Sequence, residues 1–213
     1  MGFKYPCFIS YCHGQRYLIK GFISEFKENL DSSLEAYFDE GIYVDTDRLD
    51  PGFKYNNALA KAICQSLCMI VIYIPKYDRH EYCRKEFAAM EYLEEKRFRL
   101  IGNPKLSDFG MIIPVILRGE KDDLPQKIAK NIHYADFSRW TTASIRIKDD
   151  EHSIDEIEKI AKHIHKLYKS IENYCDNIFY DCESFRLPEN APLWNDSPIT
   201  QTYPGSWNGE KGV

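Results

Sequence analysis

Long hydrophobic runs are missing from this chain of 213 residues. No stretch reaches the roughly 18 consecutive apolar residues that suggest a membrane-spanning helix. The opening residues, MGFKYPCFISYC, lack the basic start and long apolar centre of a signal peptide, and they lack the Ser or Thr of a myristoylation site. We therefore expect no membrane partner and a cytoplasmic location.

An excess of positive charge is also missing. The chain carries 28 Lys and Arg against 33 Asp and Glu, a net charge of −5, and its isoelectric point is about 5.7. Proteins that bind nucleic acids usually show a basic footprint. We therefore expect no nucleic-acid partner.

Two phosphate-binding motifs do not occur in the sequence. It contains neither G-x-G-x-x-G nor G-x-x-x-x-G-K-[ST], and dehydrogenases and P-loop enzymes use the backbone of those loops to hold phosphates. The pattern therefore argues against both classes of enzyme.

Cysteine spacing argues against a metal site and a disulfide framework. The seven cysteines are odd in number, form no C-x-x-C, and mostly lie in or beside apolar segments. We expect buried free thiols in a reducing compartment, with no metal and no bound cofactor. The residues are Cys7, Cys12, Cys64, Cys68, Cys83, Cys175 and Cys182.

The most informative stretch runs from residue 68 to residue 93. Residues 68–74 are continuously apolar, which is typical of a central parallel strand covered on both faces. Pro75 ends the strand, and residues 77–80 form a polar loop. A helix follows, with apolar residues spaced by three or four at Cys83, Phe87, Met90 and Leu93.

Strands and helices alternate along the rest of the chain. Further strands are expected over 7–11, 42–45, 111–117 and 133–137, and further helices over 18–30, 56–66 and 154–171, with a short helix at most over 126–131. This alternation predicts an α/β fold, a parallel sheet of about five strands with helices on both faces.

Three local features of these elements can be tested. Residues 31–33 either interrupt the first helix or cap a second one. Pro114 favours a bulge or a less central place for its strand. Ser153 and Glu156 form an S-x-x-E capping box, which predicts the start of the last helix.

Composition changes after residue 173. Residues 184–213 hold Trp194 and Trp207 and are rich in proline, with no periodicity. We divide the chain into a domain of residues 1–172 and a tail of residues 173–213. The tail is either flexible or an irregular strap that packs on the domain or on a neighbour.

Five segments of the chain, taken in order, match the motifs of one protein family. Cys7 to Tyr11 resembles the opening F-I-S-Y strand, and Asp45 with Leu49-Asp50-Pro51-Gly52 resembles the BB loop. Ala62, Ile63 and Ser66 before the apolar strand fit the A-I..S..I-V-V pattern. Residues 82–86, YCRKE, are similar to the W-C-x-x-E signature. Together these segments resemble a TIR (Toll/interleukin-1 receptor) domain over roughly residues 5–172, and the resemblance implies a flavodoxin-like fold.

The sequence departs from the family pattern at two places. Tyr82 stands where tryptophan is usual, and both rings can stack on a flat group. Cys12-His13-Gly14 replaces the common S-x-x-D after the first strand, which leaves the contacts near that strand to be established.

The resemblance implies cleavage of the nicotinamide–ribose bond of NAD+, with Glu86 as the catalytic carboxylate. NAD+ is then the substrate, and either ADP-ribose or a cyclic ADP-ribose isomer is the product. Without the family motif, Glu86 would be read as a solvated helix acid.

Other residues are candidates for holding the substrate. Tyr82, one turn before Glu86, could stack on a ring, and Arg48 and Lys54 could meet the pyrophosphate. Ser10, Tyr11, His13, Asp45 and Tyr77 are placed around the same crevice. Each also has a purely structural reading: core serine, packed aromatic, turn histidine, loop brace or exposed loop cation.

The resemblance also implies self-association through TIR–TIR contacts, with the loop of residues 46–54 reaching a neighbour. A free-standing bacterial protein in anti-phage defence of the Thoeris kind is the setting it suggests. The alternative is a non-enzymatic TIR scaffold that acts by self-association. A flavodoxin-like receiver shares the fold, but a fold alone does not settle function.

Overall fold

The computed structural model describes residues 2–13, 17–45, 55–102, 110–119, 124–129, 134–140, 146–174 and 182–194. Five parallel strands in these ranges form one sheet in the order β2-β1-β3-β4-β5. The strands are β1 (Tyr5–Tyr11), β2 (Tyr43–Val44), β3 (Ser66–Tyr73), β4 (Ile112–Ile116) and β5 (Ala135–Asp136). This sheet confirms the predicted α/β fold.

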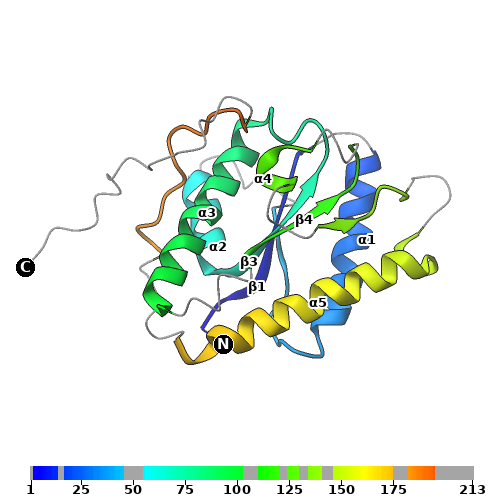
Figure 1. Cartoon of the computed structure of the whole chain (residues 1–213), viewed down its shortest axis with the longest axis horizontal. Coiled ribbons are helices and arrows are strands. Elements are labelled where there is room, and N and C mark those ends of the chain that lie inside the picture. Colours follow the sequence, from blue (N-terminus) through cyan, green and yellow to red (C-terminus); the bar gives the residue numbers. More distant parts are fainter. Residues whose placement is uncertain are drawn as a thin grey trace, which may run out of the picture.

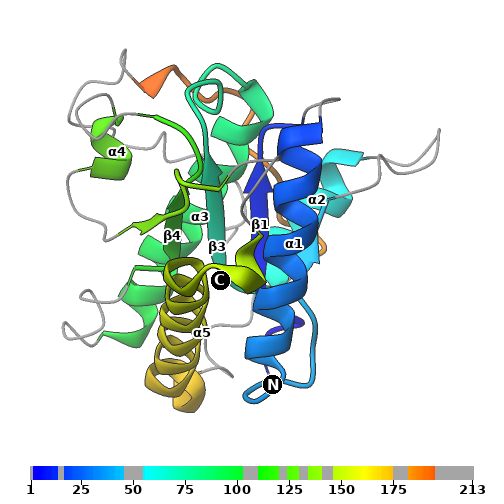
Figure 2. The ribbon, with the colours of Figure 1, turned by 90° about the vertical axis from the view of Figure 1, so that its right-hand side faces the viewer.

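Helices cover both faces of the sheet (Figures 1 and 2). α1 packs with α5 on one face, and α2 packs with α3 on the other. The helices are α1 (Tyr17–Leu34), α2 (Tyr55–Gln65), α3 (Glu81–Ile101), α4 (Gln126–Ala129) and α5 (Glu151–Ile171), with 3₁₀ turns η3 (Ile147–Asp149) and η4 (Glu172–Tyr174).

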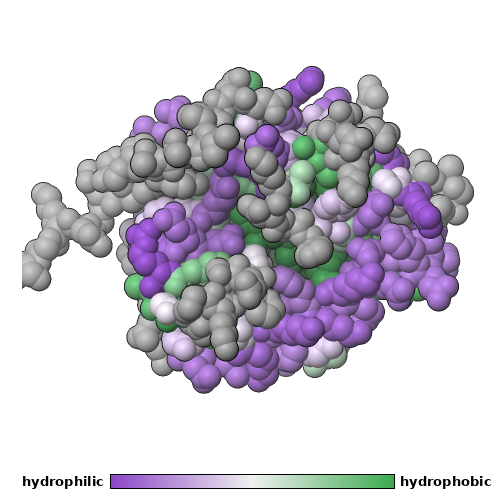
Figure 3. Space-filling view, viewed as in Figure 1, coloured by the Kyte–Doolittle hydropathy of each residue, from purple (hydrophilic) through white to green (hydrophobic). Residues whose placement is uncertain are grey.

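The core of the sheet is the pair β1 and β3. All eight residues of β3 are buried, and β3 pairs with β1 from Tyr5↔Ser66 to Tyr11↔Ile72. Continuous apolarity is what a strand with a helix layer on each face requires. In Figure 3 hydrophobic residues gather in the middle of the visible face, over the strands and framed by hydrophilic surface.

Pro114 does not place β4 at an edge of the sheet. β4 lies between β3 and β5 and is buried throughout. Pro114 pairs with Val71, whereas β5 begins only opposite Val115. A proline that lacks an N–H is tolerated here because β5 does not extend as far as position 114.

The predicted capping box is wrong. Asp150 is the N-cap of α5, and its carboxylate accepts hydrogen bonds from the backbone N–H and the hydroxyl of Ser153. Glu156 forms an ion pair with Lys159. Aspartate and serine are both good caps, so the sequence offered two starts, and the upstream one is used.

Helix α1 runs through residues 31–33 without interruption. The Asp31 carboxylate accepts a hydrogen bond from the backbone N–H of Ile42 and forms an ion pair with Lys27. Asp31 therefore fixes the chain that enters β2, instead of ending the helix.

The expectation of free cysteines fails at two positions. Cys64, in the last turn of α2, forms a disulfide with Cys182, 118 residues later in the sequence. Cys7, Cys12, Cys68 and Cys83 are free and buried, as expected, and Cys175 lies outside the described residues.

Part of the tail packs on the domain. Phe185 and Trp194 are each 9% exposed, and residues 182–194 run beside α3 (Figure 1). The prediction of a strap that packs on the domain is therefore confirmed for these residues. The division of the chain at residue 172 stays a prediction. No helix in the part of the chain that the structure describes is long and apolar enough to cross a membrane.

Arg97 is a buried cation that joins three elements. One of its terminal nitrogens donates to the carbonyl oxygens of Ser66 and Leu67, both at 3.0 Å, and the other donates to the carbonyl of Cys64 at 2.8 Å. Its guanidinium also lies 4.9 Å from the centre of the Phe3 ring. Arg97 thus ties α3 to the turn between α2 and β3.

We expect Arg97→Met to lower the free energy of unfolding by about 3 kcal/mol, because it leaves buried carbonyls without donors. Urea unfolding followed by circular dichroism measures this loss. The matched control is Arg99→Met, two residues later, where the side chain is 73% exposed; it should change stability by less than about 0.5 kcal/mol. Equal effects of the two substitutions would contradict the structural role of Arg97.

Candidate active site

Glu86 lies where the carboxyl ends of two central strands meet. β1 connects to β2 on one side of the sheet and β3 leads to β4 on the other, so the topology reverses between β1 and β3. Open α/β sheets bind ligands at such a switch point, outside the carboxyl ends of the strands. α3 follows β3 and presents Glu86 at this place from its second turn.

A chain of hydrogen bonds holds the Glu86 carboxyl group. The Ser10 hydroxyl, at the end of β1, donates to Glu86 Oε2 at 2.5 Å. The Tyr77 hydroxyl, in the connection from β3 to α3, lies 2.6 Å from Ser10 Oγ and 3.4 Å from the carbonyl oxygen of Cys83. Three separate segments therefore fix the position of one carboxyl group.

Burial dominates the electrostatics of Glu86, which is 4% exposed. Loss of solvent raises the pKa of Glu86 to about 8, although the hydrogen bond from Ser10 lowers it. Asp45 raises this pKa further through charge repulsion, and His13 lowers it. Such a strong shift marks candidate functional sites.

A second group of predicted residues lies beside the first. The rings of Tyr11 and His13 stack at 4.5 Å, and the Tyr11 hydroxyl donates to the backbone carbonyl of Asp45 at 3.0 Å. His13 Nε2 is 3.4 Å from Asp45 Oδ2, and this contact raises the pKa of His13. The structure therefore brings Tyr11, His13 and Asp45 together at the ends of β1 and β2.

Tyr82 belongs to neither of these groups. Tyr82 is 46% exposed, with the Lys85 ammonium 5.9 Å from its ring centre. It lies on the solvent side of the first turn of α3, whereas Glu86 points inward. Arg48 and Lys54 lie outside the described residues.

Sequence reasoning missed one pairing beside Glu86, and it expected Trp194 only as part of a tail that packs on the domain or on a neighbour. Cys12 and Cys83 interact, and the hydrogen bond from Cys83 is the main reason that the pKa of Cys12 falls to about 7. Trp194 packs against Tyr77 and Phe87, with ring centres 5.6 and 4.8 Å away. Neither pairing has a local signal, because each joins residues far apart in the chain.

The described ranges contain no group of three or more His, Cys, Asp and Glu side chains arranged to hold a metal ion.

The fold is thus a doubly wound α/β domain with a buried carboxyl group at its switch point. A family model described as TIR domain matches residues 7–150. The chain therefore belongs to the TIR domain family, as its motifs indicated. No curated protein matches it.

A solved structure also resembles the chain. It is described as the activated Roq1 resistosome directly recognizing the pathogen effector XopQ (TIR domains). The match has 17% sequence identity and a TM-score of 0.41, and covers 81% of this chain and 98% of the Roq1 chain.

Burial of Glu86 predicts a stability that depends on pH. Folding raises its pKa from an ordinary 4.5 to about 8, so between these values the folded state holds a proton that the unfolded state has lost. The contribution of Glu86 to stability therefore falls as pH rises through this window and levels off above it. The side chain of Glu86→Gln stays neutral. Its free energy of unfolding should therefore rise, relative to that of the parent, by about 2 to 4 kcal/mol from pH 5 to pH 8.

Urea unfolding of both proteins at the two pH values measures this difference. Glu95→Gln serves as the control, because Glu95 is on the same helix but its side chain is 55% exposed. A Glu86→Gln protein whose advantage does not grow with pH would show that Glu86 is ionised in the folded state.

Proposed function

We propose that this TIR domain cleaves the nicotinamide–ribose bond of NAD+, with Glu86 as the catalytic carboxylate. The observation that carries the proposal is the buried Glu86 carboxyl group, fixed by Ser10 at the switch point of the sheet. Family membership supports it, because the resemblance implied this reaction from the YCRKE motif.

The reaction suits a single carboxylate. When the bond between nicotinamide and ribose breaks, its electron pair goes to the nicotinamide nitrogen, so a neutral molecule leaves and no general acid is needed. Positive charge then develops at the anomeric carbon, as in glycoside hydrolysis. A fixed carboxylate in a site that excludes water stabilises that charge strongly.

Glu86 must be ionised to act in this way. Near neutral pH its pKa of about 8 keeps most of the free enzyme protonated. The positive charge of bound nicotinamide favours the carboxylate, because a nearby opposite charge lowers the pKa of an acid. Substrate binding is therefore expected to release a proton from Glu86.

Other residues have supporting roles in the proposal. Ser10 and Tyr77 position Glu86, while Tyr11, His13 and Asp45 line the adjacent strand ends. We assign Tyr82 to stacking on a ring of the substrate, and Arg48 and Lys54 to its pyrophosphate. NAD+ is the substrate, and the proposal includes neither a cofactor nor a metal.

Glu86→Gln should lower the rate of nicotinamide release by at least about a hundredfold, because it keeps the volume of the side chain and removes its charge. Chromatography of reactions with purified protein and NAD+ measures this rate. Glu81→Gln is the control: Glu81 is on the same helix, and its side chain is 60% exposed beside Lys85. Full activity in the Glu86→Gln protein would refute the catalytic assignment.

We further propose that the enzyme acts as a homo-oligomer in the cytoplasm, with the loop of residues 46–54 reaching a neighbouring protomer. Defence signalling of the Thoeris kind is the setting that we assign to it. The alternative is a TIR scaffold without activity. Nicotinamide release by the purified protein excludes the alternative, and release that is unchanged by Glu86→Gln excludes our mechanism.

We expect a cyclic ADP-ribose isomer among the products. Attack by a group of the same molecule gains from proximity, and exclusion of water selects this attack over hydrolysis. Tyr77 and Trp194 are both largely buried beside the site, so deleting residues 184–213 should raise the share of ADP-ribose. Mass spectrometry of early time points decides the point: ADP-ribose as the sole product of the intact chain would mean that the protein is a plain NAD+ hydrolase.

A further inference from the structure

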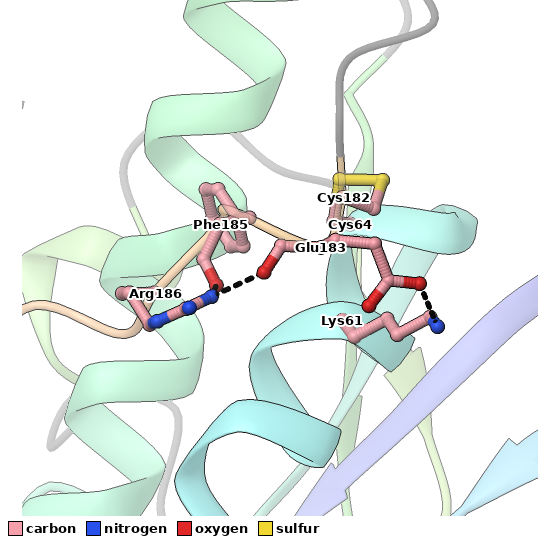
Figure 4. Close-up of polar contacts among 6 residues, drawn as sticks. All are labelled: Lys61, Cys64, Cys182, Glu183, Phe185 and Arg186. Carbon is pink, nitrogen blue, oxygen red and sulfur yellow. Dashed lines mark hydrogen bonds and ion pairs between the residues drawn. A yellow bond between two sulfur atoms is a disulfide. The ribbon is translucent and has the colours of Figure 1, made fainter. Parts of the chain in front are cut away.

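Residues 182–194, which we call the strap, are attached to α2 at one end. The disulfide between Cys64 and Cys182 joins the strap covalently to the last turn of α2 (Figure 4). Next to it Glu183 forms an ion pair with Lys61, one turn earlier on the same helix. The side chain of Arg186 donates to the carbonyl oxygens of Glu183 and Phe185, which shapes the strap as it leaves α2.

The middle of the strap is attached to α3. The ring of Phe185 lies 6.4 Å from that of Tyr92. Arg84 donates from Nε to the carbonyl oxygen of Ala191 at 2.8 Å, and from Nη1 to the carbonyl oxygen of Asp78 at 2.6 Å. One side chain of α3 thus connects the strap to the loop that carries Tyr77.

The far end of the strap packs against the residues that hold the catalytic candidate. Trp194 contacts Phe87, which follows Glu86 in the chain, and Tyr77, whose hydroxyl is 2.6 Å from Ser10 Oγ. Ser10 in turn donates to Glu86. Trp194 is therefore linked to the Glu86 carboxyl group through two side chains, and its ring helps to keep Tyr77 fully buried.

We propose that Trp194 is a positioning residue for Glu86, and that the Cys64–Cys182 disulfide makes this positioning depend on redox conditions. The proposed effect on activity rests on the proposed function, because it concerns the same site. The release of the strap by reduction does not depend on the proposed function.

Reduction requires a dithiol reductant. Its thiolate attacks Sγ of Cys182, because Cys182 is only partly buried whereas Cys64 is buried. Cys64 leaves as a thiolate and takes up a proton, and a mixed disulfide forms on Cys182. The second thiol of the reductant then displaces Cys182, so two electrons and two protons pass to the cysteines and the reductant becomes a disulfide.

Loss of the crosslink weakens the attachment of the strap. The crosslink closes a loop of more than a hundred residues, and such long loops are the ones that a crosslink constrains most. The ion pair of Glu183 lies at the surface, where its side chain is 72% exposed, and exposed pairs stabilise little. The reduced strap should therefore detach more often, which admits water to Tyr77 and Phe87.

Hydration of Tyr77 should change the titration of Glu86. Burial is the main cause of the raised pKa of Glu86, so entry of water lowers that pKa. The polar and titratable groups around Glu86 come from β1, β2 and its end, the β3–α3 connection and α3. They are Ser10, Cys12, His13, Tyr43, Asp45, Tyr77 and Cys83.

Hydrogen exchange tests the strap without any assay of activity. Reduction of the purified full chain by dithiothreitol should speed exchange in peptides covering residues 185–194 and 77–87. The Cys64→Ser/Cys182→Ser protein is the matched control, and it should exchange fast with or without the reductant. Unchanged exchange after complete reduction, checked by alkylation of the thiols, would overturn the proposal. Absence of a crosslinked Cys64–Cys182 peptide in the unreduced protein would also overturn it.

The pH dependence of nicotinamide release tests the link to Glu86. Trp194→Ala should lower the midpoint of the profile of kcat/KM against pH by about one pH unit. Trp194→Phe keeps an aromatic ring, so its midpoint should lie close to that of the parent. Leu193→Ala is the control, because Leu193 is 42% exposed on the same strap. An unmoved midpoint in Trp194→Ala would refute the positioning role. If neither the parent nor any variant releases nicotinamide, the proposed function is wrong. Hydrogen exchange then still tests whether reduction releases the strap.

Discussion

The hydrogen bond from Ser10 to a carboxyl group with almost no access to solvent is the interaction on which the proposed site depends. Burying a carboxyl group is unfavourable unless it is paired or protonated. Glu86 is partly paired, through a hydrogen bond, and its burial also favours protonation. The Ser10 hydroxyl stabilises the ionised form, while burial favours the protonated form. These two opposing effects set the pKa of Glu86 at about 8, so a change in its surroundings changes the fraction of Glu86 that is ionised.

That balance requires several segments to stay in place. The long pairing of β1 with β3 puts Ser10 beside the start of α3. Tyr77 contacts Ser10, and Trp194 packs on Tyr77. Arg97 and the Cys64–Cys182 disulfide meet at the last turn of α2 and hold both α3 and the strap. The contacts that keep water from Glu86 therefore also join the tail to the domain.

Much of the fold could be predicted because its information is local. The apolar run of β3 and the spacing of Cys83, Phe87, Met90 and Leu93 fix a strand and a helix by burial alone. The start of α5 was misplaced because Asp150 and Ser153 are both competent caps. Placement of β4 was uncertain because the effect of Pro114 depends on where its neighbour β5 begins.

The sequence by itself determined the alternation of strands and helices, and its motifs determined the family and the choice of Glu86 as the candidate catalyst. The resemblance placed Ser10 and Tyr77 around the same crevice, but only the tertiary structure decided how they hold the Glu86 carboxyl group. Ser10 and Tyr77 approach it from 76 and from nine residues away in the chain, and Cys64 and Cys182 join across 118 residues. Periodicity reports which face of an element is buried, whereas the partners on that face, and hence the pKa of Glu86, follow only from the packing of distant segments.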